Sequence, residues 1–228
     1  NVTIYIWAND SDLISTVINL TIQINNTKPN VSGIVFNPLV VYKTTNLNAT
    51  INYTDVDNES SAIFYNWTVN GLQVFYINIS SVISGTQNIS TLNTTYFKKH
   101  DNITIYVWAN DGDLNSIRIN STIQVNNSLP NITSINVTSN QIPIYKNSTL
   151  TGFCNATDGD NETLTLYYNW YLNGVLNNTN TTVNIIQGTY SNNTLNQSVI
   201  LAKYQNWTFV CVSYDNDTNS TAINATAQ

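Results

Sequence analysis

The feature that most constrains the fold is a strand ending in an acidic turn, which occurs three times. Its central copy spans Asn102–Asp113, where apolar side chains alternate with polar or aromatic ones at the period of a pleated strand. The first copy spans Asn1–Asp12 and the third spans Asn206–Asp217. A spacing of about 100 residues fits one β-sandwich domain per repeat, rather than a short solenoid repeat.

The rest of the chain reads as short strands between polar turns, which is the pattern of an antiparallel β-sandwich. No segment shows convincing helical periodicity. We expect strands at 17–24, 34–36, 39–42, 49–53, 62–69, 72–79, within 86–97, and at 103–109, 117–125, 150–155, 164–172, 182–186, 195–201, 207–213 and 221–226.

These repeats predict three segments. Residues 1–26 are expected to be the last two strands of a preceding repeat, followed by full domains at 27–127 and 128–228. An alternative is that residues 1–26 form a strand pair that completes a domain of a neighbouring molecule, as in donor-strand complementation. The first interpretation needs no special mechanism, because it requires only that the segment begins within an array of repeats. The short linkers at 25–29 and 126–130 end in proline, so we expect consecutive domains to form a stiff rod.

The second full domain carries the residues typical of an immunoglobulin core. Cys154 lies on its second expected strand, Trp170 on the third and Cys211 on the sixth. The set resembles the immunoglobulin inter-sheet disulfide packed on a buried tryptophan, and the resemblance implies a Cys154–Cys211 bridge. Such a bridge implies an oxidising compartment. Two free buried thiols are the alternative.

The first full domain keeps the tryptophan without the cysteines. Trp67 aligns with Trp170, while Ile51 and Val107 take the places of the two cysteines. We therefore expect an apolar pair there instead of a disulfide.

Both full domains also contain Asp-x-Asp-x-Glu followed by Trp-x-x-Asn-Gly, at 67–71 and 170–174. With the core residues above, these motifs make the chain similar to the tandem immunoglobulin-like repeats of prokaryotic cell-surface proteins, including PKD-type and cadherin-like modules of archaeal envelopes. The resemblance covers the whole chain and implies an all-β fold of tandem immunoglobulin-like antiparallel β-sandwiches. It departs from the antibody pattern at Phe209, where antibodies have tyrosine.

Asparagine usage points to the cell surface. The N-glycosylation sequon occurs at 28 of the 41 asparagines. Alternating polar residues on a strand would produce the reverse triplet equally often, yet it occurs only ten times. We therefore predict covalent N-glycans, with the clearest candidates on outward strand positions and in turns: Asn30, Asn58, Asn66, Asn93, Asn102, Asn120, Asn147, Asn161, Asn206 and Asn216.

Acidic residues gather in two kinds of turn that lie at the same end of an immunoglobulin-like sandwich. Turns favour aspartate in any case, but converging like charges repel without a cation, and hard oxygen ligands suit Ca²⁺. The predicted metal ligands are Asp55, Asp57, Glu59, Asp111 and Asp113 in the first full domain, and Asp158, Asp160, Glu162, Asp215 and Asp217 in the second.

Lysines offer a competing explanation for this charge. Lys98, Lys99 and Lys203 precede the sixth strand, at the opposite pole of each domain. The lysine end of one repeat is therefore expected to face the acidic end of the next, which favours head-to-tail contact between neighbouring repeats or copies of the chain.

The paired aromatics Tyr5/Trp7 and Tyr106/Trp108 are expected to point outward, where they could stack on carbohydrate or contact protein. Glycans on the same chain could equally cover them.

Other function classes find little support. The formal charge of −6 argues against nucleic acid, and no apolar run is long enough to span a membrane. His100 is the only histidine, and no Ser/His/Asp or Cys/His set can be assembled, so we do not expect an enzyme.

The sequence thus predicts a structural extracellular or cell-surface glycoprotein whose repeats form a stalk, filament or surface-layer element. The alternative is the stalk of an adhesin whose binding domain lies outside this segment.

Overall fold

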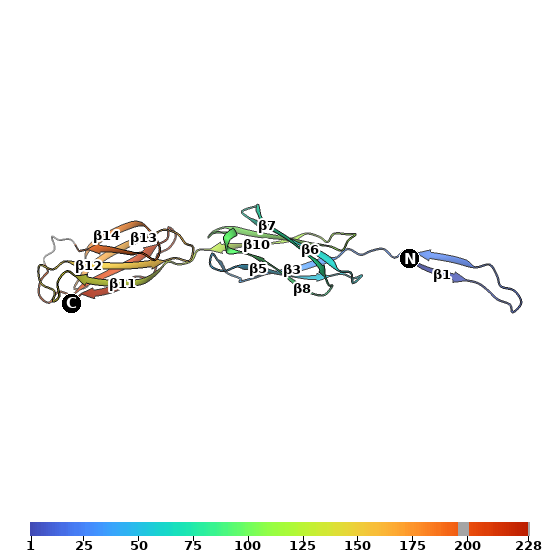
Figure 1. Cartoon of the computed structure of the whole chain (residues 1–228), viewed down its shortest axis with the longest axis horizontal. Coiled ribbons are helices and arrows are strands. Elements are labelled where there is room, and N and C mark those ends of the chain that lie inside the picture. The colour runs from blue at the N-terminus through green and yellow to red at the C-terminus, as the bar shows by residue number, and fades with distance from the viewer. Residues whose placement is uncertain (196–200, 228) are drawn as a thin grey trace. The chain divides into compact units, whose positions relative to one another are not determined.

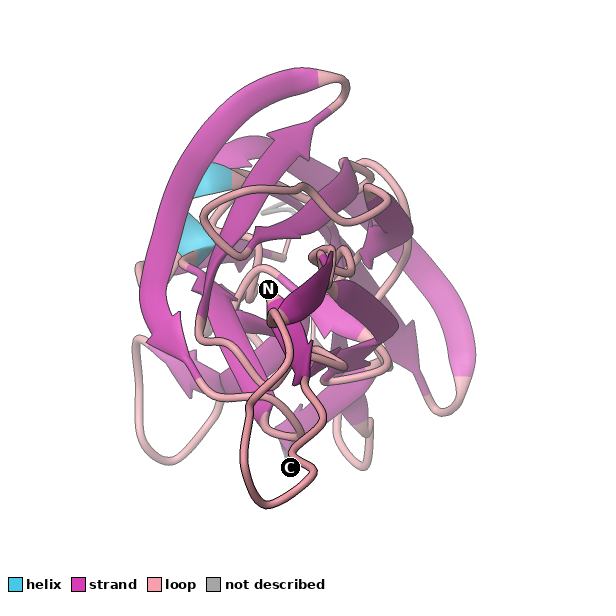
Figure 2. Cartoon of the chain, turned by 90° about the vertical axis from the view of Figure 1, so that its right-hand side faces the viewer, coloured by secondary structure: helices cyan, strands magenta, loops and turns pink. Residues whose placement is uncertain are grey.

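The computed structural model describes residues 1–195 and 201–227, and almost all of its regular structure is β-strand (Figures 1 and 2). The predicted all-β fold is therefore confirmed. Its first strands are β1 (Val2–Ile6), β2 (Ile18–Ile22), β3 (Asn30–Asn37), β4 (Val41–Tyr42), β5 (Leu47–Thr54), β6 (Ser61–Val69), β7 (Leu72–Val82), β8 (Gln87–Leu92), β9 (Asn102–Asn110) and β10 (Ile119–Asn126). The later strands are β11 (Asn131–Ser139), β12 (Leu150–Thr157), β13 (Leu164–Leu172), β14 (Val175–Ile185), β15 (Tyr190–Thr194), β16 (Trp207–Tyr214) and β17 (Ile223–Ala227), and a 3₁₀ turn, η1 (Thr94–Tyr96), precedes β9.

The strands form five sheets. The hairpin β1-β2 stands as a two-stranded sheet. What we call the first sandwich consists of the sheets β3-β5-β8 and β4-β10-β9-β6-β7, and the second sandwich consists of β11-β12-β15 and β14-β13-β16-β17. Three strands face five in the first sandwich and four in the second, and strands joined in this order give the immunoglobulin-like arrangement that the sequence predicts. The pairing of β4 with β10 is parallel, with Val41 opposite Val125.

Packing divides the chain into two compact units. Unit 1 comprises Asn1–Asn37, Asn48–Leu92 and Thr104–Thr122, and unit 2 comprises Pro38–Leu47, Asn93–Ile103 and Ile123–Gln228. The segments 38–47 and 93–103 are thus grouped with the second sandwich in unit 2, although β4 pairs with β10 in the first sandwich. The domain boundaries at 26/27 and 127/128 remain a prediction from sequence.

Several strands differ from the expected positions. Strand β14 (Val175–Ile185) begins seven residues before the strand expected at 182–186. Strand β11 (Asn131–Ser139) was not predicted, because a register shift between Ile132 and Ser134 breaks the alternation on which the sequence pattern depends. The strand expected at 195–201 lies mostly outside the described residues, and the structure places β15 earlier, at Tyr190–Thr194.

Each sandwich has a tryptophan at its centre. Trp67 and Trp170 are fully buried, and their indole N–H groups donate to Ser90 and Asn193 at 2.9 and 2.8 Å. Burial of an indole is favourable only if its N–H finds an acceptor, so each tryptophan fixes one polar residue of the facing sheet.

The predicted difference between the two cores is also present. Cys154 on β12 and Cys211 on β16 form a disulfide between the two sheets of the second sandwich. Ile51 and Val107, which take these places in the first sandwich, are both fully buried.

Beside the disulfide, a small residue faces a large one. A Cβ atom at Gly152 would lie 2.4 Å from the ring of Phe209. The equivalent residues of the first sandwich are Ala49 and Ile105, both fully buried. At this position the second core therefore pairs glycine with phenylalanine, whereas the first core pairs alanine with isoleucine.

We predict that Gly152→Ala destabilises the second sandwich by about 1–3 kcal/mol, because the added methyl group overpacks against Phe209. Adding Phe209→Ile, which copies the pair in the first sandwich, should recover part of the loss. Denaturant-dependent hydrogen exchange of the β12 and β16 amides measures both effects. Equal stability of Gly152→Ala and the wild type would contradict this account of the core.

Candidate functional site

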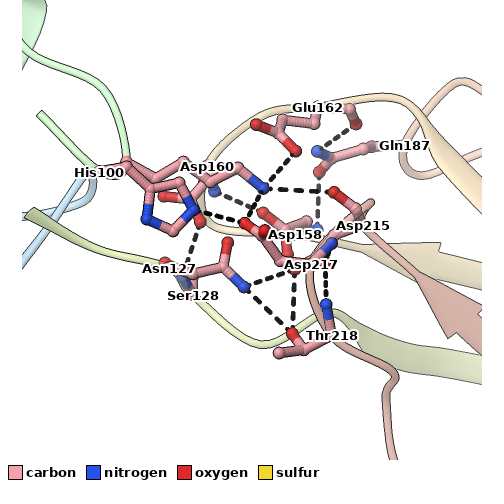
Figure 3. Close-up of polar contacts among 11 residues, drawn as sticks. His100, Asn127, Ser128, Asp158, Asp160, Glu162, Gln187, Asp215, Asp217 and Thr218 are labelled. Carbon is pink, nitrogen blue, oxygen red and sulfur yellow. Dashed lines mark hydrogen bonds and ion pairs between the residues drawn. The ribbon is translucent and has the colours of Figure 1, made fainter.

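The acidic residues of the second sandwich meet where three chain segments converge (Figure 3). One loop joins β12 to β13, a second follows β16, and the linker 127–130 enters β11. We call the five carboxylates here the second acidic cluster: Asp158, Asp160, Glu162, Asp215 and Asp217. The equivalent residues of the first sandwich form the first acidic cluster: Asp55, Asp57, Glu59, Asp111 and Asp113.

The first aspartate after the repeated strand closes its own turn. Asp215 Oδ1 accepts from the backbone N–H groups of Asp217 and Thr218 at 2.8 and 2.6 Å. Asp111 and Asp10 accept from the corresponding amides in their own turns. Burial opposes ionisation of Asp215, but these hydrogen bonds and one from Asn127 outweigh it and lower its pKa.

The linkers are tied to the same loops. The Ser128 backbone N–H donates to Asp160 Oδ2 at 2.6 Å, and the Asn127 amide donates to Asp215 Oδ2 at 2.8 Å. Thr27 bonds Asp57 in the same way, at 2.6 Å, while the Asn26 amide bonds Asp111 at 3.1 Å. Sequence reasoning missed these linker residues, although their repetition in both linkers was a usable signal.

A lysine occupies the second acidic cluster. Lys99 Nζ lies 2.7 Å from Glu162 Oε2 and 2.9 Å from Asp217 Oδ2, and it also donates to the backbone oxygen of Asp215 at 3.2 Å. His100 Nε2 lies 2.6 Å from the same Asp217 Oδ2. Within unit 2, Lys99 therefore contacts the acidic turns, whereas head-to-tail contact between repeats or copies of the chain stays a prediction.

The segment that carries Lys99 is a tight turn, residues 98–101, which we call the lysine loop. The Lys98 backbone N–H donates to Asp101 Oδ2 at 2.6 Å, and His100 adopts a positive φ of 67°. The His100 N–H donates to the Val125 carbonyl at 2.7 Å, which fixes the turn on β10.

These contacts shift the pKa values of Lys99 and Asp217 in opposite directions. Burial alone would lower the pKa of Lys99, but the hydrogen bonds to Glu162 and Asp217 outweigh it and raise that pKa well above its ordinary range. The same bonds from Lys99, together with one from His100, lower the pKa of Asp217. Lys99 and Asp217 thus stabilise each other as a charged pair.

Among the described residues, no such counterion is paired with the first acidic cluster. Every ion pair in the described part of the chain involves the second cluster. Desolvation raises the pKa of Glu59, and the negative charges of Asp111, Asp55, Asp57 and Asp113 raise it further. The two clusters have the same residues in the same turns but differ in whether a cation meets them.

Both clusters contain buried oxygen atoms without a hydrogen-bond donor in the described residues. They are Asn26 Oδ1 and Asp55 Oδ2 in the first, and Asn127 Oδ1, Asp158 Oδ2 and Asp160 Oδ1 in the second. Unpaired oxygens at equivalent places suit a hard cation. Within the described residues, however, no three His, Cys, Asp or Glu side chains are arranged so that they could hold a metal ion. Ca²⁺ binding therefore stays a prediction.

The predicted glycosylation asparagines are mostly accessible. Nine of the ten candidates are exposed, and Asn66 is half-buried with its Oδ1 atom covered. Asn58, Asn161 and Asn216 adopt positive φ values, which asparagine tolerates better than most residues. Turn geometry thus supplies a second reason for asparagine at these three positions.

The aromatic pairs differ in their surroundings. Tyr5 and Trp7 are each 58% exposed. Trp108 is half-buried, because it stacks on Phe64 at 5.2 Å between ring centroids and lies under the guanidinium of Arg118. The same guanidinium lies 4.2 Å from the Tyr106 ring centroid, so the predicted second platform is partly covered by the chain itself.

No helix among the described residues has the length and apolar content needed to cross a membrane.

Comparison with known proteins finds similarity among solved structures. No protein-family model matches the chain, and no curated protein sequence matches it. Among solved structures, it is similar to a segment of two fibronectin type-III domains from chicken tenascin, at 11% identity and a TM-score of 0.40. That alignment covers 87% of this chain and 99% of the tenascin segment.

We predict that Lys99→Met raises the pKa of Asp217 toward its ordinary value of 3.8, because the substitution removes the hydrogen bond that lowers it most. Since the pKa of Asp217 is lowered by folding, its contribution to stability is present above pH 3.8 and is lost as the pH falls through the lowered pKa. Carboxyl-carbon NMR titration measures the shift. Lys98→Met is the matched control and should leave Asp217 unchanged; the same titration in both variants would contradict the assigned pairing.

Proposed function

We propose that the chain is a structural spacer of an extracellular glycoprotein, in which consecutive immunoglobulin-like sandwiches are held together as part of a stalk, filament or surface layer. The observation that carries the proposal is the position of Lys99 Nζ between Glu162 and Asp217. A stalk that presents a binding domain elsewhere would use the same contacts.

The Lys99 contact differs from an ordinary surface ion pair. Exposed pairs contribute little, because water and salt screen them and long side chains lose entropy. The Lys99 side chain is only 12% exposed and meets three oxygen acceptors. A lysine so placed is less screened, and removing one partner leaves charge without compensation.

Close packing supports the same proposal. A Cβ atom at Gly159, in the β12–β13 loop, would lie 2.8 Å from Ser128 Oγ and 3.2 Å from the Thr44 methyl group. The equivalent residue of the first sandwich is Val56, which is 84% exposed. Glycine is therefore used where the loop meets neighbouring segments of unit 2, whereas the valine at the equivalent place is exposed.

The surface and the disulfide support an extracellular location. Disulfides persist in oxidising compartments, and a sugar coat would keep a β-protein with only 9% charged residues in solution. Glycans would also hinder edge-to-edge pairing of strands. N-glycosylation of the exposed sequons is part of the proposal.

Calcium would reinforce the acidic clusters. The unpaired oxygens of Asn26 and Asp55 and the like charges around Glu59 support a cation at the first cluster. At the second cluster the ammonium group of Lys99 already supplies positive charge. We therefore propose that Ca²⁺ acts mainly on the first sandwich.

The spacer proposal predicts a narrow distance distribution between spin labels placed at Leu39 and Val175, two exposed residues of unit 2. Lys99→Glu should broaden it by electrostatic repulsion. Combining Lys99→Glu with Glu162→Lys and Asp217→Lys should narrow it again. Pulsed electron paramagnetic resonance with genetically encoded labels measures the distribution.

Lys203→Glu is the matched control, because Lys203 precedes β16 as Lys99 precedes β9 and makes no ion pair in the described residues. It should leave the distribution unchanged. A broad distribution in the wild type, insensitive to Lys99, would contradict the proposed spacer.

The calcium proposal predicts that Ca²⁺ at 100 times its Kd stabilises the first sandwich by about 2.7 kcal/mol. The second sandwich should respond only after Lys99→Met removes the competing ammonium group. Thermal melts with Ca²⁺ or with a chelator test this, and Asp55→Asn should abolish the response. A melting temperature that changes with neither Ca²⁺ nor the chelator would contradict the calcium proposal.

A further inference from the structure

Strands β7 and β14 are equivalent edge strands of the two sandwiches. Each is 11 residues long and lies at one end of the larger sheet of its sandwich, where it pairs with a single neighbour among the described residues. Their pairings with β6 and β13 contain register shifts at equivalent places. An edge strand presents backbone N–H and C=O groups that no neighbouring strand pairs, so it can template the addition of another strand.

The middle of β7 is apolar, whereas the middle of β14 is polar. Matched through their paired strands, the equivalent residues are Phe75, Tyr76 and Ile77 on β7 and Asn178, Thr179 and Asn180 on β14. Two sequons, at Asn177 and Asn180, lie in the polar stretch, and none begins within residues 72–77. One edge therefore has polar side chains and glycosylation sequons that oppose strand addition, and the other has the uncharged, β-favouring composition that promotes it.

Ile77 shows that the core-facing side of this edge is incompletely covered. It lies opposite Tyr65, which is fully buried, so the Ile77 side chain is on the inner side of the sheet. It is nevertheless 37% exposed. A strand added beside β7 would bury this apolar surface, which is favourable.

Tyr76 supplies apolar surface on the outer side of the same edge. It lies opposite Asn66, is 47% exposed, and its ring centroid is 6.5 Å from that of Phe64 and 6.3 Å from that of Trp108. Asn78 begins a sequon and is also on the outer side, opposite Phe64. Side chains stand roughly perpendicular to a sheet, so a glycan on Asn78 would leave the edge itself open.

A second copy of the chain is the partner that fits this edge. A two-fold axis beside β7 aligns two copies antiparallel, and each copy then adds the same apolar side chains to both faces. The chain has a formal charge of −6, but no charged residue lies between Leu72 and Val82, so the two strands meet without direct charge repulsion. The opposite edge of this sheet is β4, which has only two residues. Pairing at β7 therefore closes as a dimer instead of continuing as a fibre.

We propose that β7 is a lateral interface, at which two copies of this chain join their five-stranded sheets by antiparallel pairing of β7 with β7. The interface is at the edge of the first sandwich, so it goes beyond the proposed function, which concerns contacts between consecutive sandwiches. Its test does not involve Lys99.

Sedimentation equilibrium of the full chain tests the interface. The wild type should show a reversible equilibrium between monomer and dimer. Ile77→Lys should weaken the dimer by at least about 10-fold, because it places a like charge from each copy at a desolvated edge. Asn180→Lys, at the equivalent position of β14, is the matched control and should leave the dimer unchanged.

Hydrogen exchange locates the contact. When the protein concentration rises through the dissociation constant of the dimer, exchange should slow at the β7 amides that face away from β6 and stay the same at the β14 amides. The amides of β5 and β9 report whether the first sandwich is still folded in Ile77→Lys. Loss of the dimer can therefore be distinguished from unfolding.

Three outcomes would overturn the proposal. The first is a chain that stays monomeric up to about 1 mM, where even weak association is detected. The second is a dimer that Ile77→Lys leaves intact, or one that slows exchange on β14 or β4 instead of β7. The third is an open-ended polymer, which would contradict closure by a two-fold axis.

Discussion

The acidic clusters depend on one local interaction, the pair of hydrogen bonds that an aspartate carboxylate accepts from the backbone just after it. Asp10, Asp111 and Asp215 all make this pair, although Asp10 lies in a hairpin with exposed faces and Asp215 is fully buried. The turn is therefore fixed by the local sequence rather than by its surroundings. Once it is closed, the second carboxylate of each turn is free to meet a partner from elsewhere.

This division of roles explains how two clusters of the same composition differ. The first aspartate of the turn and the linker amide fix the backbone, so Glu162 and Asp217 can both reach Lys99. The equivalent pair, Glu59 and Asp113, is held by the same turns without a lysine among the described residues, and the pKa of Glu59 is raised by burial first and by the surrounding negative charges second. The same turns thus meet a lysine in one cluster and, among the described residues, none in the other, because the counterion comes from a different segment of the chain.

Sequence patterns predicted those parts of the structure that local periodicity and pairing encode. The repeated strand and the contact of lysine with acidic turns followed from spacing and charge, whereas the tryptophan beside a Cys154–Cys211 bridge was implied by the resemblance to immunoglobulin domains. β11 was missed because its register shift breaks alternation, and β3 was placed short because Gly33, at a φ of 68°, lies in a similar irregularity. The roles of Asn26 and Asn127 were hidden by the abundance of asparagine, since composition cannot separate an amide that binds a carboxylate from one in a sequon.

The parallel pairing of β4 with β10 has a mechanical consequence. Val41 lies near the start of the first sandwich, whereas Val125 lies at its last strand, where the chain leaves for the linker. Tension applied along the polypeptide pulls these two strands in opposite directions, parallel to their own axes. The hydrogen bonds between them are then loaded in shear, so they must break together rather than open one after another. Strand β4, the shortest strand of the first sandwich, is therefore the first to resist stretching of the chain.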